Sequence, residues 1–259
     1  MTNMKRICII GDSHAAALKT GWTAIAAEYP GVKPTFFAAR TELMESLEVA
    51  GNALVATPPL RKRFKLTSGG QAEIRNTYDA YAICGLRISC ALAVQVQKAF
   101  EAKQKGGAAS PESSTDDVLV KAIEDSLQMT MGIRMLDMVR QITDATAIVI
   151  PQPSRAEIDA PVSDSPVNPS KNMRWILPVF QTACVRLARQ RKASFLPQPA
   201  ETLSETSLAT KATYARSPSR LDTEKTGEDR SHMNSEYGAI VLREALGNLA
   251  NDPISDTLR

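Results

Sequence analysis

The sequence predicts an α/β protein built on a single doubly wound, flavodoxin-like parallel sheet of five strands, flanked by helices. Short apolar runs of strand length recur along the chain with helix-forming segments between them, and this alternation is typical of βαβ units. The first run, residues 7–10, is apolar at every position, as expected of a strand buried on both faces. Right-handed crossovers with the strand order 2-1-3-4-5 would put strands one and three side by side.

The elements of the first half follow from apolar spacing and from glycine and proline breaks. Gly11 ends strand one, and a run of alanines then begins a helix at residues 14–28. Strand two is expected at 32–39 and strand three at 78–87. Polar and apolar residues alternate at 63–66, which predicts a short solvent-edged hairpin. The basic side chains of this hairpin either bind an anionic substrate or form a charged edge that resists aggregation.

The second half continues the same alternation. Helices are expected at 89–102, 118–127, 133–142, 172–191 and 235–248, with strand four at 147–150 and strand five at 193–196. Mobile loops are expected near 103–117, 158–170 and 198–228. The last of these is either a substrate-binding lid or an excursion without a role. Strands of one sheet are expected on both sides of the 103–117 loop, so this loop is no domain linker, and residues 1–259 are expected to form one domain.

Composition limits the classes of binding partner and the cellular compartment that we expect for the protein. The net charge is +3, with 31 basic and 28 acidic residues, which gives no reason to expect a nucleic acid or a membrane surface as partner. No apolar run approaches a membrane span of about 18 residues, and no signal-peptide pattern is present. Four cysteines without C-x-x-C spacing and two histidines make a metal site improbable. We expect a cytoplasmic protein without a cofactor; its oligomeric state stays open.

Two short segments at opposite ends of the chain hold both histidines and the candidate catalytic groups. Ser13 lies in the turn after strand one, at the sheet edge where ligands bind in open parallel sheets. A serine hydroxyl becomes a good nucleophile when a base takes its proton, and histidine is the usual base. His232 lies just before the last helix, with Asp229 three residues earlier to orient its ring. Topology should bring these three residues together.

Gly11-Asp12-Ser13 and Asp229-x-x-His232 resemble the first and last motif blocks of the SGNH (GDSL-type) hydrolase family. The resemblance implies an acyl-enzyme mechanism with Ser13 as nucleophile, His232 as base and Asp229 as its partner. It also implies N–H donors for an oxyanion hole, from Ser13 and from Gly85 after strand three.

The sequence departs from this family pattern at both of the middle blocks. After strand two the family has a glycine, whereas here Ala38-Ala39-Arg40-Thr41 follows and Gly51 is the first candidate. After strand three the family has Gly-x-Asn-Asp, whereas Gly85-Leu86-Arg87 stands here with Arg87 in the place of the asparagine. Arg87 either supplies N–H donors to the oxyanion, binds a substrate carboxylate, or pairs with an acid.

Three further residues belong to the candidate site. His14 is expected at the helix start or in contact with a partner, in preference to the role of base. Asp12 is most simply a turn or cap residue. Arg155 follows strand four at the carboxyl edge of the sheet and could touch substrate.

The leading hypothesis for function is a serine esterase that removes a small acyl group, such as acetyl, from a carbohydrate or small ester. One alternative is an acyltransferase in which a sugar hydroxyl replaces water. Another is a catalytically weak, hydrolase-like binding protein, which the missing asparagine favours and the retained Ser13, Asp229 and His232 oppose.

Overall fold

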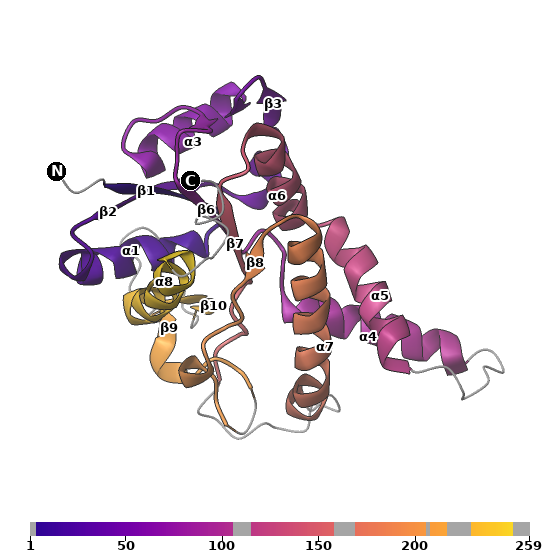
Figure 1. Ribbon diagram of the computed structural model, residues 1–259. Coiled ribbons are helices and arrows are strands. Elements are labelled where there is room, and N and C mark those ends of the chain that lie inside the picture. Colours follow the sequence, from indigo (N-terminus) through magenta and orange to yellow (C-terminus); the bar gives the residue numbers. More distant parts are fainter. Residues whose placement is uncertain (1–3, 106–114, 158–168, 206–207, 217–228, 251–259) are drawn as a thin grey trace.

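The computed structural model describes residues 4–105, 115–157, 169–205, 208–216 and 229–250 (Figure 1). Within them, five parallel strands form the central sheet in the order β2-β1-β6-β7-β8. This is the predicted order 2-1-3-4-5, and the predicted fold class is confirmed. The strands are β1 (Lys5–Gly11), β2 (Val32–Ala38), β6 (Ala80–Cys84), β7 (Thr146–Ile150) and β8 (Ser194–Phe195).

The register of the sheet brings the first and third predicted strands together at their carboxyl ends. β1 pairs with β6 from Ile7 opposite Ala80 to Gly11 opposite Cys84. On its other side β1 pairs with β2, where Gly11 lies opposite Ala38. The turn that follows Gly11 therefore emerges between the exits of two neighbouring strands.

Helices cover both faces of the sheet, each with its own apolar core. Side chains of α1 (Ala15–Ile25) and α8 (Ser235–Ala250) pack on one face with Ile7 and Ile9, and Figure 1 shows these two helices side by side. The other face carries Cys8 and Ile10. It packs against α3 (Pro58–Ser68), α6 (Met131–Ile142) and the three-helix group α4 (Cys90–Lys105), α5 (Thr115–Gln128) and α7 (Pro169–Gln190). The alternation of apolar side chains along β1 thus fills two cores.

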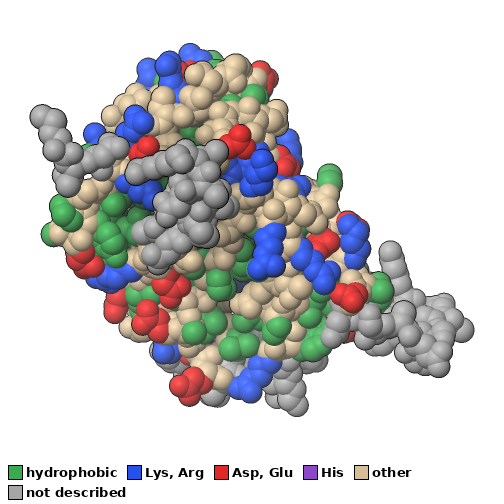
Figure 2. Space-filling model, in the orientation of Figure 1, with side chains coloured by type: hydrophobic (Ala, Val, Ile, Leu, Met, Phe, Trp, Pro, Cys, Tyr) green, Lys and Arg blue, Asp and Glu red, His purple; other side chains and the backbone are tan. Residues whose placement is uncertain are grey.

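The hairpin predicted around residues 63–66 is wrong, because this segment is the middle of helix α3. The helix begins with prolines at its first two positions and ends at Gly69, which has φ +75°. Leu60 and Phe64 are buried one helical turn apart, whereas Leu66 is 69% exposed. Residues 61–63 and 65 carry exposed basic side chains, and Figure 2 shows basic side chains gathered where Figure 1 draws α3.

Short elements that the sequence did not predict join the larger ones. The 3-10 turn η1 (Ala26–Glu28) continues α1, and α2 (Thr41–Met44) follows β2. A small antiparallel sheet consists of β3 (Glu48–Ala50), β4 (Ala53–Val55) and β5 (Ile74–Arg75). Gly51 lies in the exposed turn between β3 and β4 with φ +60°, so it belongs to a hairpin turn and does not follow β2 directly.

The segment predicted as the long loop 198–228 is structured in its first part. It contains η2 (Ala200–Thr202), η3 (Ala212–Tyr214) and β9 (Ala215–Arg216). Buried Thr202 and Thr210 accept hydrogen bonds from the Gln198 amide, at 3.1 and 2.9 Å. β9 pairs antiparallel with β10 (Asp229–Met233). In this first part of the predicted loop, Gln198, Thr202 and Thr210 thus form a hydrogen-bonded network.

Parts of the predicted mobile loops belong to helices. Residues 103–105, 115–117 and 169–170 are helical, which shortens two of the predicted loops, while 106–114, 158–168 and 217–228 lie outside the described residues. In the described part of the chain, no helix combines the length and the apolar character that a membrane crossing requires. The prediction of a single domain stays a prediction.

Candidate active site

The turn after β1 presents Ser13 at the carboxyl edge of the sheet. Gly11 is required there, because a Cβ on it would lie 2.6 Å from the carbonyl oxygen of Cys84 in the neighbouring strand. Ser13 itself is exposed, and its Oγ lies 2.8 Å from Nε2 of His232. The two ends of the chain, 219 residues apart, therefore meet at hydrogen-bonding distance.

The other ring nitrogen of His232 faces Asp229. Nδ1 lies 2.8 Å from Oδ2 and 2.9 Å from Oδ1 of the carboxylate. An ionised carboxylate only accepts hydrogen bonds, so Nδ1 carries the proton and the neutral ring offers Nε2 as an acceptor to the Ser13 hydroxyl. The structure thus brings together the three residues that the sequence proposed, in the order hydroxyl, imidazole, carboxylate.

The environment of Asp229 favours its ionised form. Burial by itself opposes ionisation, but the hydrogen bond and the charge of His232 act the other way. The backbone N–H groups of His232 and Ser231 also donate to Oδ1, at 3.2 and 3.3 Å. Together they outweigh the burial and hold the pKa of Asp229 below its ordinary value. Asp229 therefore stays charged at neutral pH and can balance an imidazolium ion.

The pairing of β9 with β10 is irregular next to His232. Asp229 pairs with Arg216 and Met233 with Ala215, so the register shifts between these two pairs. His232 and Met233 are neighbours in β10, and successive side chains of a strand point to opposite sides. His232 therefore faces Ser13 while Met233 is buried.

Two glycines bring α1 and α8 into direct backbone contact. A Cβ on Gly21 would lie 2.3 Å from the backbone nitrogen of Ala239, and a Cβ on Gly238 would lie 1.8 Å from the carbonyl oxygen of Ala17. Ser13 precedes α1 and His232 precedes α8 by a few residues. The close crossing of the two helices therefore fixes the distance between the hydroxyl and the imidazole.

Asp12 joins the loops around Ser13 and is more than a turn or cap residue. Its side chain is only 4% exposed. It accepts hydrogen bonds from the backbone N–H groups of His14 (3.1 Å) and Leu86 (2.8 Å), the Gln152 amide (3.2 Å) and the Thr41 hydroxyl (3.4 Å). Through this one carboxylate, the exits of β1, β2, β6 and β7 are tied together. Asp12 therefore supports the turn that carries Ser13.

The structure corrects the proposed role of Gly85. Its backbone N–H donates to the carbonyl oxygen of Ile150 at 2.9 Å, so it is already engaged and is no oxyanion donor. A Cβ on Gly85, which has φ +74°, would lie 2.5 Å from Oδ1 of Asp12. A glycine is needed here because the Asp12 carboxylate packs directly against its Cα.

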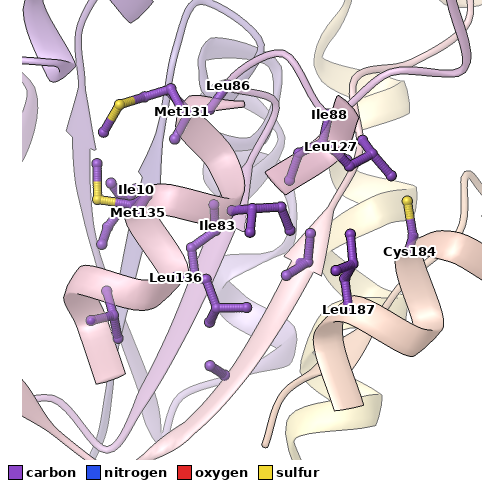
Figure 3. Close-up of a cluster of buried hydrophobic side chains, with 14 of the residues drawn as sticks. Ile10, Ile83, Leu86, Ile88, Leu127, Met131, Met135, Leu136, Cys184 and Leu187 are labelled. Atoms are coloured by element: carbon purple, nitrogen blue, oxygen red, sulfur yellow. The ribbon is translucent and has the colours of Figure 1, made fainter. Parts of the chain in front are cut away.

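Arg87 follows Gly85 in an unusual backbone conformation. Leu86 has φ +52° and Arg87 has φ +69°, a region that costs ordinary residues about 1–2 kcal/mol each. Burial of the Leu86 side chain holds the turn, and Figure 3 labels Leu86 with Ile88 and Met131 in one apolar cluster. The Arg87 guanidinium forms an ion pair with Glu42 at 3.2 Å, which fits the prediction that it pairs with an acid.

His14 contacts the ring of His232, whereas Arg155 lies exposed after β7. The His14 ring stacks on His232, with centroids 5.2 Å apart and an interplanar angle of 27°. Burial lowers the pKa of His14, and the neighbouring His232 adds to this effect against the charges of Asp12 and Asp229. Arg155 is exposed, and its carbonyl oxygen accepts a hydrogen bond from the Thr210 N–H at 3.1 Å.

Sequence reasoning missed two polar residues of this network, Thr41 and Gln152. Both follow predicted strands closely, Thr41 after β2 and Gln152 after β7. Their positions at strand exits of a parallel sheet were the only indication available. Among the described residues, no group of three His, Cys, Asp or Glu side chains is arranged to hold a metal ion.

No protein-family model matches the sequence, and no curated protein matches it either. Two solved structures are similar in fold. An extracellular lipase from Streptomyces rimosus has a TM-score of 0.43 and 14% identity, over 93% of this chain and 99% of the lipase. A lipopolysaccharide acetyltransferase periplasmic domain from Salmonella ser. Paratyphi A has a TM-score of 0.45 and 10% identity, over 97% of this chain and 85% of that domain. The sheet order, and the places of Ser13, Asp229 and His232 along it, are those expected from the resemblance to the SGNH hydrolases.

Proposed function

We propose that the protein is a serine esterase of the SGNH type, which works through an acyl-enzyme. The single observation that carries this proposal is the continuous chain of hydrogen bonds from Ser13 Oγ to His232 Nε2 and from His232 Nδ1 to Asp229, each at 2.8 Å. Such a chain activates a hydroxyl that would otherwise be a poor nucleophile. Ser13 and His232 each lie a few residues before one of the two helices, α1 and α8, that cross in close contact.

In the first half-reaction, Ser13 Oγ attacks the ester carbonyl carbon while its proton passes to Nε2 of His232. The imidazolium that forms is balanced by the Asp229 carboxylate, which remains ionised. The tetrahedral intermediate then collapses. The bond to the alcohol oxygen breaks, and His232 returns the proton to the leaving alcohol. The acyl group is left as an ester on Ser13.

The tetrahedral oxyanion needs N–H donors, and the candidates are backbone groups. In the described residues, the N–H groups of Ser13 and Arg40 donate to no protein acceptor. Arg40 follows Ala39, whose own N–H donates to the carbonyl oxygen of Gly11 at 3.2 Å, so this loop lies beside the exit of β1. After β6, Arg87 stands where the SGNH family has an asparagine, so no asparagine side chain is available there as a donor. Loss of one oxyanion donor commonly slows turnover about 100-fold or more, so we expect a slow esterase.

In the second half-reaction, His232 removes a proton from water, and the hydroxide formed attacks the acyl-enzyme. The acid product leaves and Ser13 regains its proton from His232. The resemblance to the SGNH hydrolases supports a small acyl group, such as acetyl, on a carbohydrate or another small ester. If a sugar hydroxyl takes the place of water, the same residues catalyse acyl transfer.

A fluorophosphonate probe tests the proposal directly. We expect a mass increase on Ser13 in the full-length protein, accompanied by hydrolysis of para-nitrophenyl acetate. Ser13→Ala should abolish both, and His232→Ala should slow both about a million-fold, because the hydroxyl then lacks its base. Ser68→Ala is the matched control, since Ser68 ends α3 and bonds only locally to the carbonyl oxygen of Gln71.

The outcomes separate the three hypotheses for function. Labelling of Ser13 with hydrolysis supports the esterase. Labelling with slow hydrolysis that accelerates on addition of a sugar acceptor points to the acyltransferase. If Ser13 is not labelled and the ester is not hydrolysed, the esterase proposal is wrong and the hydrolase-like binding protein is the better hypothesis.

A further inference from the structure

Two arginines and one glutamate form a charged cluster at the loops beside Ser13. Arg40 follows β2, Arg87 follows β6, and Glu42 lies in the first turn of α2. The Arg87 Nη2 atom lies 3.2 Å from Glu42 Oε1, and these two side chains are 55% and 69% exposed. The backbone N–H of Glu42, and after it Arg87 and Arg40, lower the pKa of the Glu42 carboxyl. Arg87 thus pairs with this carboxylate directly, whereas Arg40, two residues before Glu42, acts on it only through its charge.

Backbone contacts place this cluster next to the nucleophile. Leu86, which precedes Arg87, donates its N–H to Asp12 at 2.8 Å. Thr41, which follows Arg40, donates its hydroxyl to the same carboxylate at 3.4 Å. Asp12 is the residue before Ser13. Arg40 and Arg87 are therefore each next in sequence to a residue that hydrogen-bonds to the turn that carries Ser13.

Within the cluster the charges do not cancel. The carboxylates of Asp12 and Asp229 are engaged by N–H and O–H donors within the protein. Of the three charged side chains in the cluster, two are cationic and one is anionic. An exposed ion pair contributes only about 0–1 kcal/mol, so a substrate anion can displace Glu42 from Arg87 at little cost.

We propose that Arg87, together with Arg40, selects esters that carry a carboxylate group, and that Glu42 occupies this carboxylate site when no substrate is bound. A guanidinium group matches a carboxylate in planar, bidentate geometry. This inference rests on the proposed function, because it defines the substrate class of the same site. It assigns Arg87 to substrate selection and not to the oxyanion.

The first test compares carboxylate esters with neutral partners of similar shape. On the acyl side, the pair is para-nitrophenyl hemisuccinate and para-nitrophenyl pentanoate. On the alcohol side, it is para-acetoxybenzoate and para-acetoxybenzamide. The arm with the larger preference for the carboxylate ester tells which side of the ester bond the anion occupies.

The variants are Arg87→Gln, Arg40→Gln and Glu42→Gln. We expect Arg87→Gln and Arg40→Gln each to lower kcat/KM for the preferred carboxylate ester about tenfold, through loss of a charge-assisted hydrogen bond. In Arg87→Gln, kcat/KM for the neutral ester of each pair should change by less than about twofold. Glu42→Gln should raise kcat/KM for the carboxylate ester, because the competing internal anion is removed. Arg63→Gln is the matched control, because Arg63 is an exposed residue of α3. It should leave kcat/KM unchanged for both the carboxylate ester and the neutral ester.

Binding of the anion alone gives a readout that needs no turnover. In Ser13→Ala protein, calorimetric titration with succinate and with para-hydroxybenzoate should detect binding of at least one of them, weakened about tenfold by Arg87→Gln. This keeps the inference testable even if labelling and hydrolysis fail and the esterase proposal falls.

Three results would overturn the inference. Equal losses on carboxylate and neutral esters in Arg87→Gln would mean that Arg87 acts on the reacting carbonyl or on the fold. Unchanged preference in both arms would mean that the cluster does not contact substrate. Equal binding of the free carboxylates with and without the Arg87 side chain would exclude the carboxylate site whatever the esters show.

Discussion

Replacement of Gly238 by alanine tests how helix packing sets the geometry of the site. A Cβ at this position would lie 1.8 Å from the Ala17 carbonyl oxygen, whereas ordinary contact begins at 3.4 Å. One helix backbone must therefore move by about 1.6 Å, because neither atom belongs to a side chain that can rotate away. The substitution Gly238→Ala should separate α1 from α8.

Two opposing effects set the expected change in the free energy of unfolding. Alanine in place of glycine inside a helix contributes about 1 kcal/mol of stability. Forced overpacking costs about 1–3 kcal/mol, and a clash between two backbones lies at the upper end. We therefore expect Gly238→Ala to lower the free energy of unfolding by about 2 kcal/mol. A displacement of this size between Ser13 and His232 should also lower kcat about 100-fold.

The assay combines urea unfolding with hydrolysis of para-nitrophenyl acetate below the unfolding transition. Gly247→Ala is the matched control in the same helix, because no atom lies within 4 Å of the added Cβ. It should stabilise the protein by up to about 1 kcal/mol and leave kcat unchanged. A Gly238→Ala protein as stable and active as the parent would refute the reasoning, and so would equal destabilisation by both substitutions.

Three further predictions concern the turn, the base and the pH dependence. Gly85→Ala should lower the free energy of unfolding by about 2 kcal/mol in urea titrations, because φ is +74° and the added Cβ meets the Asp12 carboxylate; an unchanged midpoint would contradict this. Asp229→Asn should lower kcat for para-nitrophenyl acetate about 1,000-fold or more with KM little changed, because an amide no longer holds Nδ1 of His232 protonated; a loss below tenfold would argue against the relay. Burial lowers the pKa of His14 from 6.5, so its contribution to stability is present above that pH and is lost as the pH falls through the lowered value. His14→Gln should therefore flatten the loss of stability below pH 6.5 in urea titrations, and an unchanged pH profile would contradict that prediction.

Much of the fold could be predicted because apolar runs are local. Residues 7–10 and 147–150 are apolar runs of strand length between breaks, and such runs mark buried strands of a parallel sheet. The error at 63–66 arose where two periods compete over a few residues. Phe64 and Leu66 fit a strand, whereas Leu60 and Phe64 fit a helix, and the burial of Leu60 decides for the helix.

The candidate site was predictable in its chemistry and not in its surroundings. Ser13, Asp229 and His232 could be named because the chain has only two histidines, one in each end segment, and because strand order brings the two ends of the chain to one edge. The engagement of the Gly85 N–H by Ile150 depends on a partner 65 residues away. Sequence spacing cannot show whether a donor is already occupied.

The sequence by itself determined the order of the strands and the identity of the hydroxyl, imidazole and carboxylate groups, because both follow from residue type and local periodicity. Only the tertiary structure decided how Asp12 joins four loops, how two glycines let α1 and α8 touch, and how β9 and β10 pair around His232. These features are contacts between distant segments at ångström precision, and they depend on packing that no short stretch of sequence encodes.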